Sequence, residues 1–470
     1  MGHESDMSDV IVVGAGISGL LCARDLLKQG FRVRVLEASE RVGGRTYSVH
    51  FGDQRLDLGG QWIAPKQQQP QIRELIEDLG LEVHPQHYAG KRILDLHCLP
   101  GPLQYSSDIP SGIGLGGLLM VQLTLWFCTL RARLSVGSGA PMDVTGKFAR
   151  LDQQSTGEVL GKLVGNSGAG ATRALVTAMV RGVFGCEPEE LSWLHFLHYV
   201  ACAGGVERLL KINNGFQEST VKGGAQQISE GLAEQVLALG GTVDFKQPVT
   251  SVVCHQDSVE LHCKDAKFRC SRCVFAMPPV RLGDIHFTPQ LPASRAALRG
   301  SNFIGCIIKS VFRYERPFWR LQGFSGEVVA EATDEEPCFN CYDHCLGDRY
   351  FLVCFMNGAP AQRWSQRSEE ERRAVLLQQL AKWFGAEAKE ALEYIEKDWA
   401  ADEFTKGCPV GCYPPNTLAP HMQALRTPCG LLYWAGTEAA ERCQGFMEGA
   451  VDAAQRVVKE VSQSLAASKL

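Results

Sequence analysis

The sequence lacks the features of a nucleic-acid-binding protein and of a secreted one. It has no cluster of basic residues, and its 47 lysines and arginines are outnumbered by 52 aspartates and glutamates, for a net charge of −5. We therefore expect no nucleic-acid partner. The first residues, MGHESDMSDV, are polar and contain no apolar core of a signal peptide. Most of the 18 cysteines are accordingly expected to be reduced thiols.

The chain also lacks an uninterrupted run of apolar residues that would span a membrane. Its most apolar window, Ile113–Leu130, contains Gln122 and Thr124, so it predicts a buried or surface-docking helix rather than a membrane anchor. The last residues, Ser468-Lys469-Leu470, have the form of a peroxisomal address. We expect the peroxisomal import receptor as a partner and a peroxisomal location; a chance tripeptide and a cytoplasmic protein are the alternative. The sequence leaves the oligomeric state unknown.

The N-terminal segment has the pattern of a dinucleotide-binding unit. The expected strand, helix and second strand are Val10–Val13, Ile17–Gln29 and Phe31–Leu36. Three glycines in G-x-G-x-x-G spacing follow the first strand: Gly14, Gly16 and Gly19. They allow a tight turn, close approach of a pyrophosphate and close helix–strand packing, and the helix N-terminus favours phosphate. Glu37 closes the second strand, where a carboxylate can accept ribose hydroxyls.

Two later segments favour FAD over NAD. Gly43-Gly44-Arg45 follows the ribose-binding acid and resembles the second signature of glutathione-reductase-like FAD proteins, in which the arginine lies near the pyrophosphate. The segment Asp57-Leu58-Gly59-Gly60-Gln61-Trp62 resembles the stretch that lines the flavin in amine oxidases. Together with the glycine-rich turn, these segments predict an FAD protein.

From Val10 to about Val458 the chain resembles the flavin-containing amine oxidases, and specifically the monoamine oxidase family. The further motifs are NGFQE at 214–218, GGAQ at 223–226, VFAMPP at 274–279, GCIIK at 305–309, PFW at 317–319, AGTE at 435–438 and GFMEGA at 445–450. The resemblance implies an α/β protein, with a glutathione-reductase-like Rossmann FAD-binding domain interleaved with an α+β substrate domain. The expected FAD-binding pieces are 1–83, 222–296 and 402–470, and the substrate pieces are 84–221 and 297–401.

The resemblance also implies roles for single residues. Lys309 matches a lysine that holds a water against flavin N5, and its apolar neighbours predict that it is buried. The helix that begins near Met447 would hold the pyrimidine end of the flavin. The residues expected at the cofactor are Gly14, Gly16, Ile17, Ser18, Gly19, Glu37, Ala38, Gly43, Gly44, Arg45, Gly59, Gly60, Gln61, Trp62, Val249, Trp399, Cys408, Gly436, Glu438, Gly445 and Met447.

Monoamine oxidases attach FAD through a cysteine, and this chain has two candidates. The local motif G-C-Y favours Cys412, whereas the spacing from Trp399 favours Cys408. We expect an 8α-S-cysteinyl bond through Cys408, because attachment is set by the distance to a fixed ring. A non-covalent flavin is the alternative.

The choice of cysteine determines which side chains face the substrate amine. With Cys408 attached, the positions of the family's two facing aromatic residues hold Pro409 and Phe446, so half of the aromatic cage is missing unless Tyr413 bends back into it. Gln217 matches a pocket glutamine and Leu210 a pocket-lining aliphatic residue. The pocket is therefore expected to be mostly apolar.

The implied reaction is oxidation of a small-molecule amine, a primary monoamine in the first instance, with Lys309, Phe446, Pro409, Gln217 and Leu210 at the reacting centre. The imine hydrolyses to an aldehyde and ammonia, and O2 is reduced to H2O2. An apolar pocket lowers the pKa of the amine, and the flavin carries the redox chemistry. A polyamine oxidase with pocket carboxylates, an L-amino-acid oxidase with a carboxylate-binding arginine and a non-catalytic flavin-binding protein are the alternatives.

Two further expectations concern metal and helices. Cys338, Cys341, His344 and Cys345 have the composition of a zinc site, but we expect structural thiols and no metal. Long helices over Thr156–Phe184 and Glu369–Phe384 are expected to roof the substrate cavity.

Overall fold

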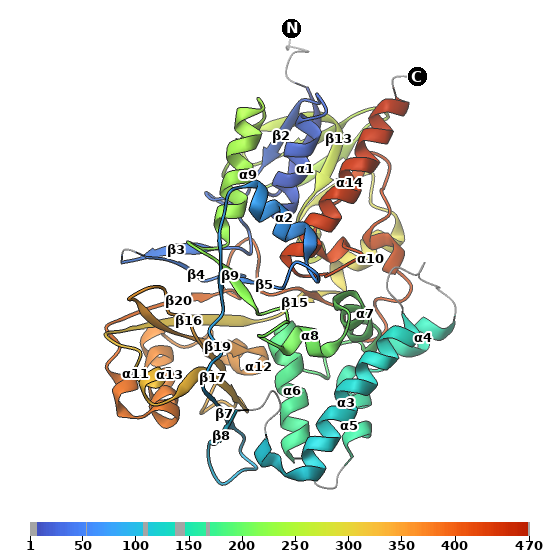
Figure 1. The fold of residues 1–470 in the computed structure, drawn as a ribbon. Coiled ribbons are helices and arrows are strands. Elements are labelled where there is room, and N and C mark those ends of the chain that lie inside the picture. Colours follow the sequence, from blue (N-terminus) through green and yellow to red (C-terminus); the bar gives the residue numbers. More distant parts are fainter. Residues whose placement is uncertain (1–6, 53, 107–110, 137–145, 166–169, 469–470) are drawn as a thin grey trace.

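The structure of the protein is a computed structural model that describes residues 7–52, 54–106, 111–136, 146–165 and 170–468. These described residues form two large sheets, three small ones and a layer of helices (Figure 1). Both termini lie at the same end of the molecule, beside the first large sheet (Figure 1). This arrangement brings the glycine-rich N-terminal segment next to the last helix of the chain.

The first large sheet joins a parallel Rossmann core to an antiparallel extension. Its order is β10-β2-β1-β13-β12-β11-β14, and β22 also pairs with β13. Strands β10, β2, β1, β13 and β22 are parallel neighbours, whereas β12 is antiparallel to both β11 and β13. The bounds are β1 Ser8–Val13, β2 Val33–Leu36, β10 Thr242–Asp244, β11 Ser251–Cys254, β12 Val259–His262, β13 Lys267–Phe275, β14 His286–Thr288 and β22 Leu432–Trp434.

Three helices from distant parts of the sequence pack together against this sheet (Figure 1). They are α1 Ile17–Leu27, α9 Gln226–Ala238 and α14 Met447–Ala467. The packing of α1 against the turn before it and the end of β13 needs glycine at one position, because a Cβ on Gly19 would lie 2.0 Å from the carbonyl oxygen of Gly14 and 3.0 Å from the Cβ of Ala276. Gly14 itself has φ +104°, a conformation that other residues rarely adopt.

The second large sheet is antiparallel except where β17 meets β7. Its order is β20-β16-β19-β18-β17-β7-β8. The bounds are β7 Lys91–Asp95, β8 Leu103–Tyr105, β16 Ile307–Tyr314, β17 Phe324–Ala330, β18 Cys338–Asp343, β19 Tyr350–Asn357 and β20 Glu393–Asp398. The small sheets are β3 Ser48–Phe51 with β4 Gln54–Asp57, β15 Phe303–Ile304 with β21 Gly411–Cys412, and β5 Trp62–Ile63 with β9 Ser219–Val221 and β6 Val83–Pro85.

The remaining helices belong mostly to the middle of the chain. The bounds are α2 Pro70–Asp78, α3 Gly114–Ser135, α4 Gly146–Asp152, α5 Thr156–Val164, α6 Gly170–Phe184, α7 Trp193–Ala203, α8 Val206–Leu210, α10 Ala293–Gly300, α11 Phe318–Leu321, α12 Gly358–Trp364 and α13 Glu369–Phe384. Together, these two large sheets and their helices confirm the expected α/β architecture, with a Rossmann domain and a substrate domain. The residue limits of the two domains stay a prediction.

Helix α3 has an apolar outer face. By length and composition alone it could cross a membrane, with a mean hydropathy of 1.4 over its most apolar window. It contacts α7, α6 and α8 on one side, while Leu115 and Trp126 are 88% and 62% exposed. The helix therefore runs along the surface of the protein, as the sequence predicted, and the expected absence of a membrane anchor stays a prediction.

The two long helices expected over the cavity differ from the prediction. The span from Thr156 to Phe184 holds two helices, α5 and α6, because Gly165 ends the first with φ +68°. Helix α13 has the predicted bounds but does not line the cavity described below. Its apolar residues, such as Leu376 and Leu380, pack with Ile308 and Phe312 on the other face of the second sheet. An amphipathic pattern identifies the buried face of a helix but not the face of the sheet that it covers.

Candidate active site

A single cavity of about 880 Å³ extends from the glycine-rich turn to the second sheet and α6. Of the site residues predicted from the sequence, all line this cavity except Gly19 and Glu438. Gly19 instead allows the close packing of α1, and Glu438 lies buried behind the cavity wall. Residues from both ends of the chain thus surround one space.

The wall near the N-terminus is built for an anionic dinucleotide. Helix α1 begins without a side-chain cap, so its first N–H groups face the glycine-rich turn. A Cβ on Gly16 would find its nearest neighbour, the carbonyl oxygen of Gly43, at 3.9 Å, which leaves room for a ligand. Glu37 accepts hydrogen bonds from the backbone N–H of Ala15 at 2.7 Å, from the backbone N–H of Ser39 at 2.9 Å and from the Ser39 hydroxyl at 2.8 Å. Because a carboxylate has about four acceptor positions, Glu37 can still accept a ribose hydroxyl.

Arg45 ties the two ends of the chain together beside the cavity. Its Nη1 donates to Glu438 Oε1 at 2.6 Å and to the carbonyl oxygen of Pro409 at 2.9 Å, and its Nη2 donates to Glu438 Oε2 at 3.2 Å. Burial lowers the pKa of Arg45, but the charge of Glu438 and its hydrogen bond outweigh burial and raise it. Arg45 therefore stays charged, and it also fixes the loop that carries Cys408 and Pro409.

Lys309 lies on β16 and is 2% exposed. Its Nζ donates to the carbonyl oxygen of Gly59 at 3.1 Å and to Oε1 of Gln61. Burial lowers its pKa to about 8, although Asp57 and Cys408 act in the opposite direction. The Nε2 group of Gln61 is buried and has no hydrogen-bond partner among the described residues. The cavity wall thus offers a buried ammonium group and a free amide donor side by side.

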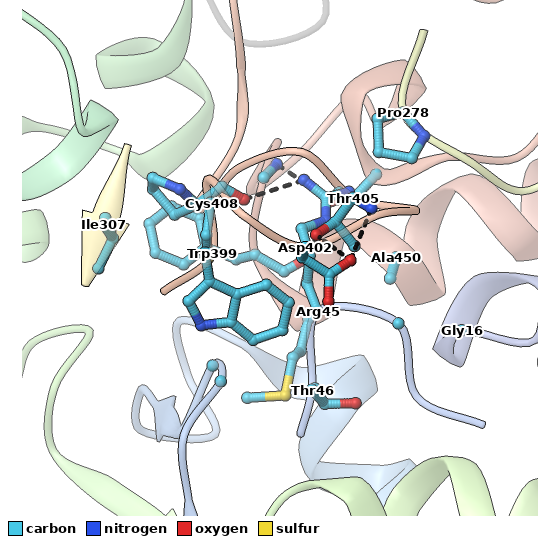
Figure 2. A pocket seen from close by; sticks show the side chains of 18 of the residues that line it. Gly16, Arg45, Thr46, Pro278, Ile307, Trp399, Asp402, Thr405, Cys408 and Ala450 are labelled. Carbon is cyan, nitrogen blue, oxygen red and sulfur yellow. Dashed lines mark hydrogen bonds between the residues drawn. The ribbon is translucent and has the colours of Figure 1, made fainter. Parts of the chain in front are cut away.

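The two candidate cysteines lie in different surroundings. Cys408 lines the cavity and packs with Ile307 and Trp399. Figure 2 shows these three residues and Arg45 among the side chains that line it. Cys412 does not line the cavity; it is buried on β21 beside the carbonyl oxygen of Phe184. The spacing from Trp399 and the local motif G-C-Y thus favour cysteines in different places. Cys408 lines the cavity, whereas Cys412 does not.

The amine end of the cavity holds Phe446 and Pro409, as expected, together with two further aromatic rings. Phe446 lines it and contacts Tyr199 and Phe216, with ring centroids 5.6 and 4.7 Å apart. Pro409 also lines it. Tyr413 does not bend into the cavity, because its ring packs on His195 with centroids 5.1 Å apart. Tyr199 and Phe216 were not predicted, since no local pattern in the sequence marks a ring that reaches a distant helix end.

Beyond these rings the cavity becomes a mainly apolar chamber between α3, α6 and the second sheet. Leu210 and Gln217 line it as predicted. Residues of the chamber that were not predicted include Tyr105, Glu327, Tyr342 and Phe355. The signal that could have found the last three is the alternation of side chains along strands, which places every second residue on one face.

Comparison with known proteins identifies the family. The pattern of the flavin containing amine oxidoreductases matches residues 17–462. The chain belongs to this family. It is 34% identical to a probable flavin-containing monoamine oxidase A of Dictyostelium discoideum, over 99% of this chain and all of the relative. It is 32% identical to flavin-containing amine oxidase B of Sus scrofa, over 98% of this chain and 87% of the relative.

Solved structures of amine oxidases match the fold of this protein over nearly its whole length. Cyclohexylamine oxidase from Brevibacterium oxydans IH-35A matches with a TM-score of 0.89 and 30% identity, over 98% of this chain and 99% of the other. Putrescine oxidase bound to putrescine matches with a TM-score of 0.89 and 27% identity, over 97% and 99%. The protein is thus a flavin-containing amine oxidase with FAD as its cofactor.

The residues present fit FAD. The glycine-rich turn, the uncapped start of α1 and Glu37 suit the pyrophosphate and ribose, and the uncapped start of α14 suits an electron-rich ring. The free amide donor of Gln61 is placed for an acceptor atom. When bound, FAD supplies the two-electron redox step. Among the described residues, no group of three or more His, Cys, Asp or Glu side chains could hold a metal ion.

Proposed function

We propose that this amine oxidase acts on a primary monoamine whose body is mainly apolar. Amine, O2 and water give an aldehyde, ammonia and H2O2: the carbon beside nitrogen loses two electrons, and O2 gains them. The observation that carries the proposal is the single cavity that joins the cofactor cradle to the apolar chamber between α6 and the second sheet.

The chamber supports a neutral amine at the reacting centre. An ammonium group loses solvation among Phe446, Tyr199 and Phe216, so its pKa falls and the free base is favoured. The buried ammonium group of Lys309 adds repulsion against a second cation nearby. A polyamine is disfavoured for the same reason, since it would bring further positive charge into this space.

Covalent attachment of FAD through Cys408 is part of the proposal. Its support is that Cys408 lines the cavity beside Trp399, whereas Cys412 is buried elsewhere. Burial raises the pKa of the Cys408 thiol to about 11, while the positive charges of Arg45 and Lys309 act to lower it. Those two cations would favour the thiolate at the moment when a bond to the ring forms.

We also propose import into the peroxisome through the C-terminal tripeptide. Ser468 caps α14 and its Oγ accepts a hydrogen bond from Arg272 at 2.5 Å, while Lys469 and Leu470 lie outside the described residues. A receptor would have to release Ser468 from Arg272. A fluorescent protein fused to the N-terminus should mark peroxisomes, and removal of Leu470 should leave it in the cytoplasm; unchanged location after removal would contradict the proposal.

The activity itself is tested by product stoichiometry. Purified enzyme with FAD, incubated with hexylamine or benzylamine, should release H2O2, ammonia and aldehyde in equal amounts. A panel with diamines and L-amino acids should give lower kcat/KM values. Preference for a diamine or an amino acid would replace the monoamine proposal, and no peroxide from any amine would reject catalysis.

A further inference from the structure

The outer face of α3 carries a stripe of large apolar side chains, here called the outer stripe. Its members are between 47% and 88% exposed: Leu115, Leu119, Leu123, Trp126 and Leu134. Neighbouring members are three, four or eight residues apart, so they follow one side of the helix. At about 1.5 Å a residue, the outer stripe is about 28 Å long. A contiguous apolar surface of this kind marks an interaction site for a protein, a ligand or a membrane.

The opposite face of α3 is packed into the protein. Thr124, Cys128 and Ala132 have no exposure, and the helix contacts α6, α7 and α8. Val121 and Leu125 on this side line the cavity. If α3 left the fold to cross a membrane, it would open the substrate chamber and expose the helices beneath it. The outer stripe therefore meets a partner while the helix lies flat along the protein surface.

Positive charge gathers at one end of the outer stripe. Four basic residues lie at the C-terminal end of α3 and on the next helix, α4: Arg131, Arg133, Lys147 and Arg150. The two helices meet there, since Nζ of Lys147 donates to the carbonyl oxygen of Leu134 at 3.2 Å. Residues 109–142 contain no Asp or Glu. The acid at the end of α4, Asp152, is buried and accepts hydrogen bonds from the backbone of Leu418 and Ala419.

This combination of shape and charge fits the surface of a membrane that contains anionic lipids. Leucine and tryptophan side chains enter the boundary between headgroups and acyl chains, and neighbouring Arg and Lys attract anionic headgroups. A second copy of this chain fits less well. In a symmetric dimer the same patch meets itself, and residues 109–142 offer no carboxylate to balance the cations of the partner copy.

We propose that α3 is an interfacial helix that docks the enzyme reversibly on an anionic membrane surface. The outer stripe enters the headgroup region, and the basic end contacts lipid phosphate and carboxylate groups. Because the inner face of the same helix lines the chamber, docking holds the chamber wall beside lipid, a phase into which amines with apolar bodies partition. The inference adds a place of action to amine oxidation and does not depend on which amine is oxidised.

Flotation of the FAD-loaded enzyme with lipid vesicles tests the docking. Vesicles of phosphatidylcholine with phosphatidylserine should carry the enzyme to the top of a density gradient, and vesicles of phosphatidylcholine alone should carry much less of it. Added salt should weaken binding to the anionic vesicles, because it screens the attraction between basic residues and headgroups. Alkaline carbonate should release the bound enzyme, since a helix that lies on the surface does not cross the bilayer.

Two double variants separate the apolar and the electrostatic parts. Leu119→Gln with Trp126→Gln should lower binding to anionic vesicles by about tenfold or more, because two large side chains no longer leave water for lipid. Arg133→Gln with Arg150→Gln should lower the ratio of anionic to neutral vesicle binding by about ten- to thirtyfold. These four described residues do not line the cavity, so turnover of a water-soluble amine should stay unchanged and report an intact fold.

A third double variant, Leu237→Gln with Leu321→Gln, is the matched control. Leu237 on α9 and Leu321 on α11 are 57% and 69% exposed and lie away from α3 (Figure 1). This variant also loses two exposed apolar side chains, but outside the outer stripe. Its vesicle binding should equal that of the unchanged enzyme.

Each other outcome overturns a defined part of the proposal. No flotation of the unchanged enzyme with either kind of vesicle would reject docking, and equal flotation with both kinds would reject the role of the basic end. Unchanged flotation of the Leu119→Gln, Trp126→Gln variant would mean that another surface meets the lipid. A dimer in analytical ultracentrifugation that this variant dissociates, without flotation, would assign the outer stripe to a second copy. Retention after carbonate would replace the interfacial helix with a membrane span.

Discussion

Arg45 and Glu438 form a buried ion pair that joins the two ends of the chain, with Nη1 and Oε1 2.6 Å apart. The side chain of Glu438 has no exposure and that of Arg45 is 19% exposed. Because Arg45 also holds the carbonyl oxygen of Pro409, this pair connects the pyrophosphate side of the cavity to the loop of Cys408. The cofactor site therefore forms only when the fold brings the two ends of the chain together.

Replacement of Glu438 by Gln should therefore destabilise the enzyme by about 3 kcal/mol, because it leaves a buried guanidinium without its counter-charge. The shift of the urea midpoint, followed by flavin fluorescence, measures this. Glu393→Gln serves as the control, since Glu393 and Arg313 form a partly exposed pair that is expected to contribute about 0–1 kcal/mol. Equal shifts in both variants would show that the Arg45–Glu438 pair contributes no more to stability than the partly exposed pair of Glu393.

The site of flavin attachment can be read from two matched variants. Cys408→Ala should release all flavin into the supernatant after acid precipitation, because the thiol that lines the cavity is gone. Cys412→Ala should keep the flavin with the protein, because Cys412 lies on β21 away from the cavity. Mass spectrometry of the flavin-bearing peptide checks the assignment. Flavin retained by the Cys408 variant would contradict it.

Lys309→Met should change how stability depends on pH. The folded-state pKa of Lys309 is about 8, below its usual value of 10.5, chiefly because of burial. Between these two values the unfolded chain binds more protons at this residue than the folded one, so Lys309 makes the unfolding free energy rise with pH in this window. Below pH 8 the cost of burying its charge is fully present.

The Met variant lacks this cost. The difference in unfolding free energy between variant and unchanged enzyme should favour the variant near pH 7 and decline by roughly 3 kcal/mol as pH rises through the window. Urea denaturation at a series of pH values gives this difference, in which groups shared by both proteins cancel. Parallel curves for the two proteins would show that Lys309 titrates as an ordinary lysine.

Two glycines in helices should respond in opposite ways to alanine. Gly19→Ala should weaken FAD binding and lower stability, because its Cβ would meet backbone at 2.0 Å. Gly161→Ala in α5 should stabilise by about 0.5–1 kcal/mol, because within the described part of the chain the added Cβ has no contact nearer than 4 Å and alanine favours the helix. Thermal unfolding and FAD titration measure both effects. Normal FAD affinity in Gly19→Ala would contradict the packing argument.

Sequence reasoning succeeded where local backbone chemistry decides the structure. The glycine-rich turn, Glu37 and the buried position of Lys309 follow from short patterns that one strand or one turn can satisfy alone. It failed where the structure depends on which two elements pack against each other. Nothing near Glu327 in the sequence tells that β17 lies beside β18 in the chamber wall, and the pattern of α13 fits either face of the sheet. The spacing from Trp399 favours Cys408 over Cys412. The number of residues between two groups limits the distance between them, whereas the local motif G-C-Y carries no such information.

The rings around the amine give the last prediction. Phe446 contacts Tyr199 and Phe216 in the cavity wall, whereas Tyr413 packs on His195 outside it. Phe446→Ala should therefore lower kcat/KM for a monoamine by about ten- to hundredfold, through loss of apolar contact with the substrate. Tyr413→Phe should leave kcat/KM unchanged, since only its hydroxyl is removed and its ring stays packed. A large loss in the Tyr413 variant would mean that Tyr413 reaches the amine during turnover, and that Pro409 and Phe446 do not enclose it alone.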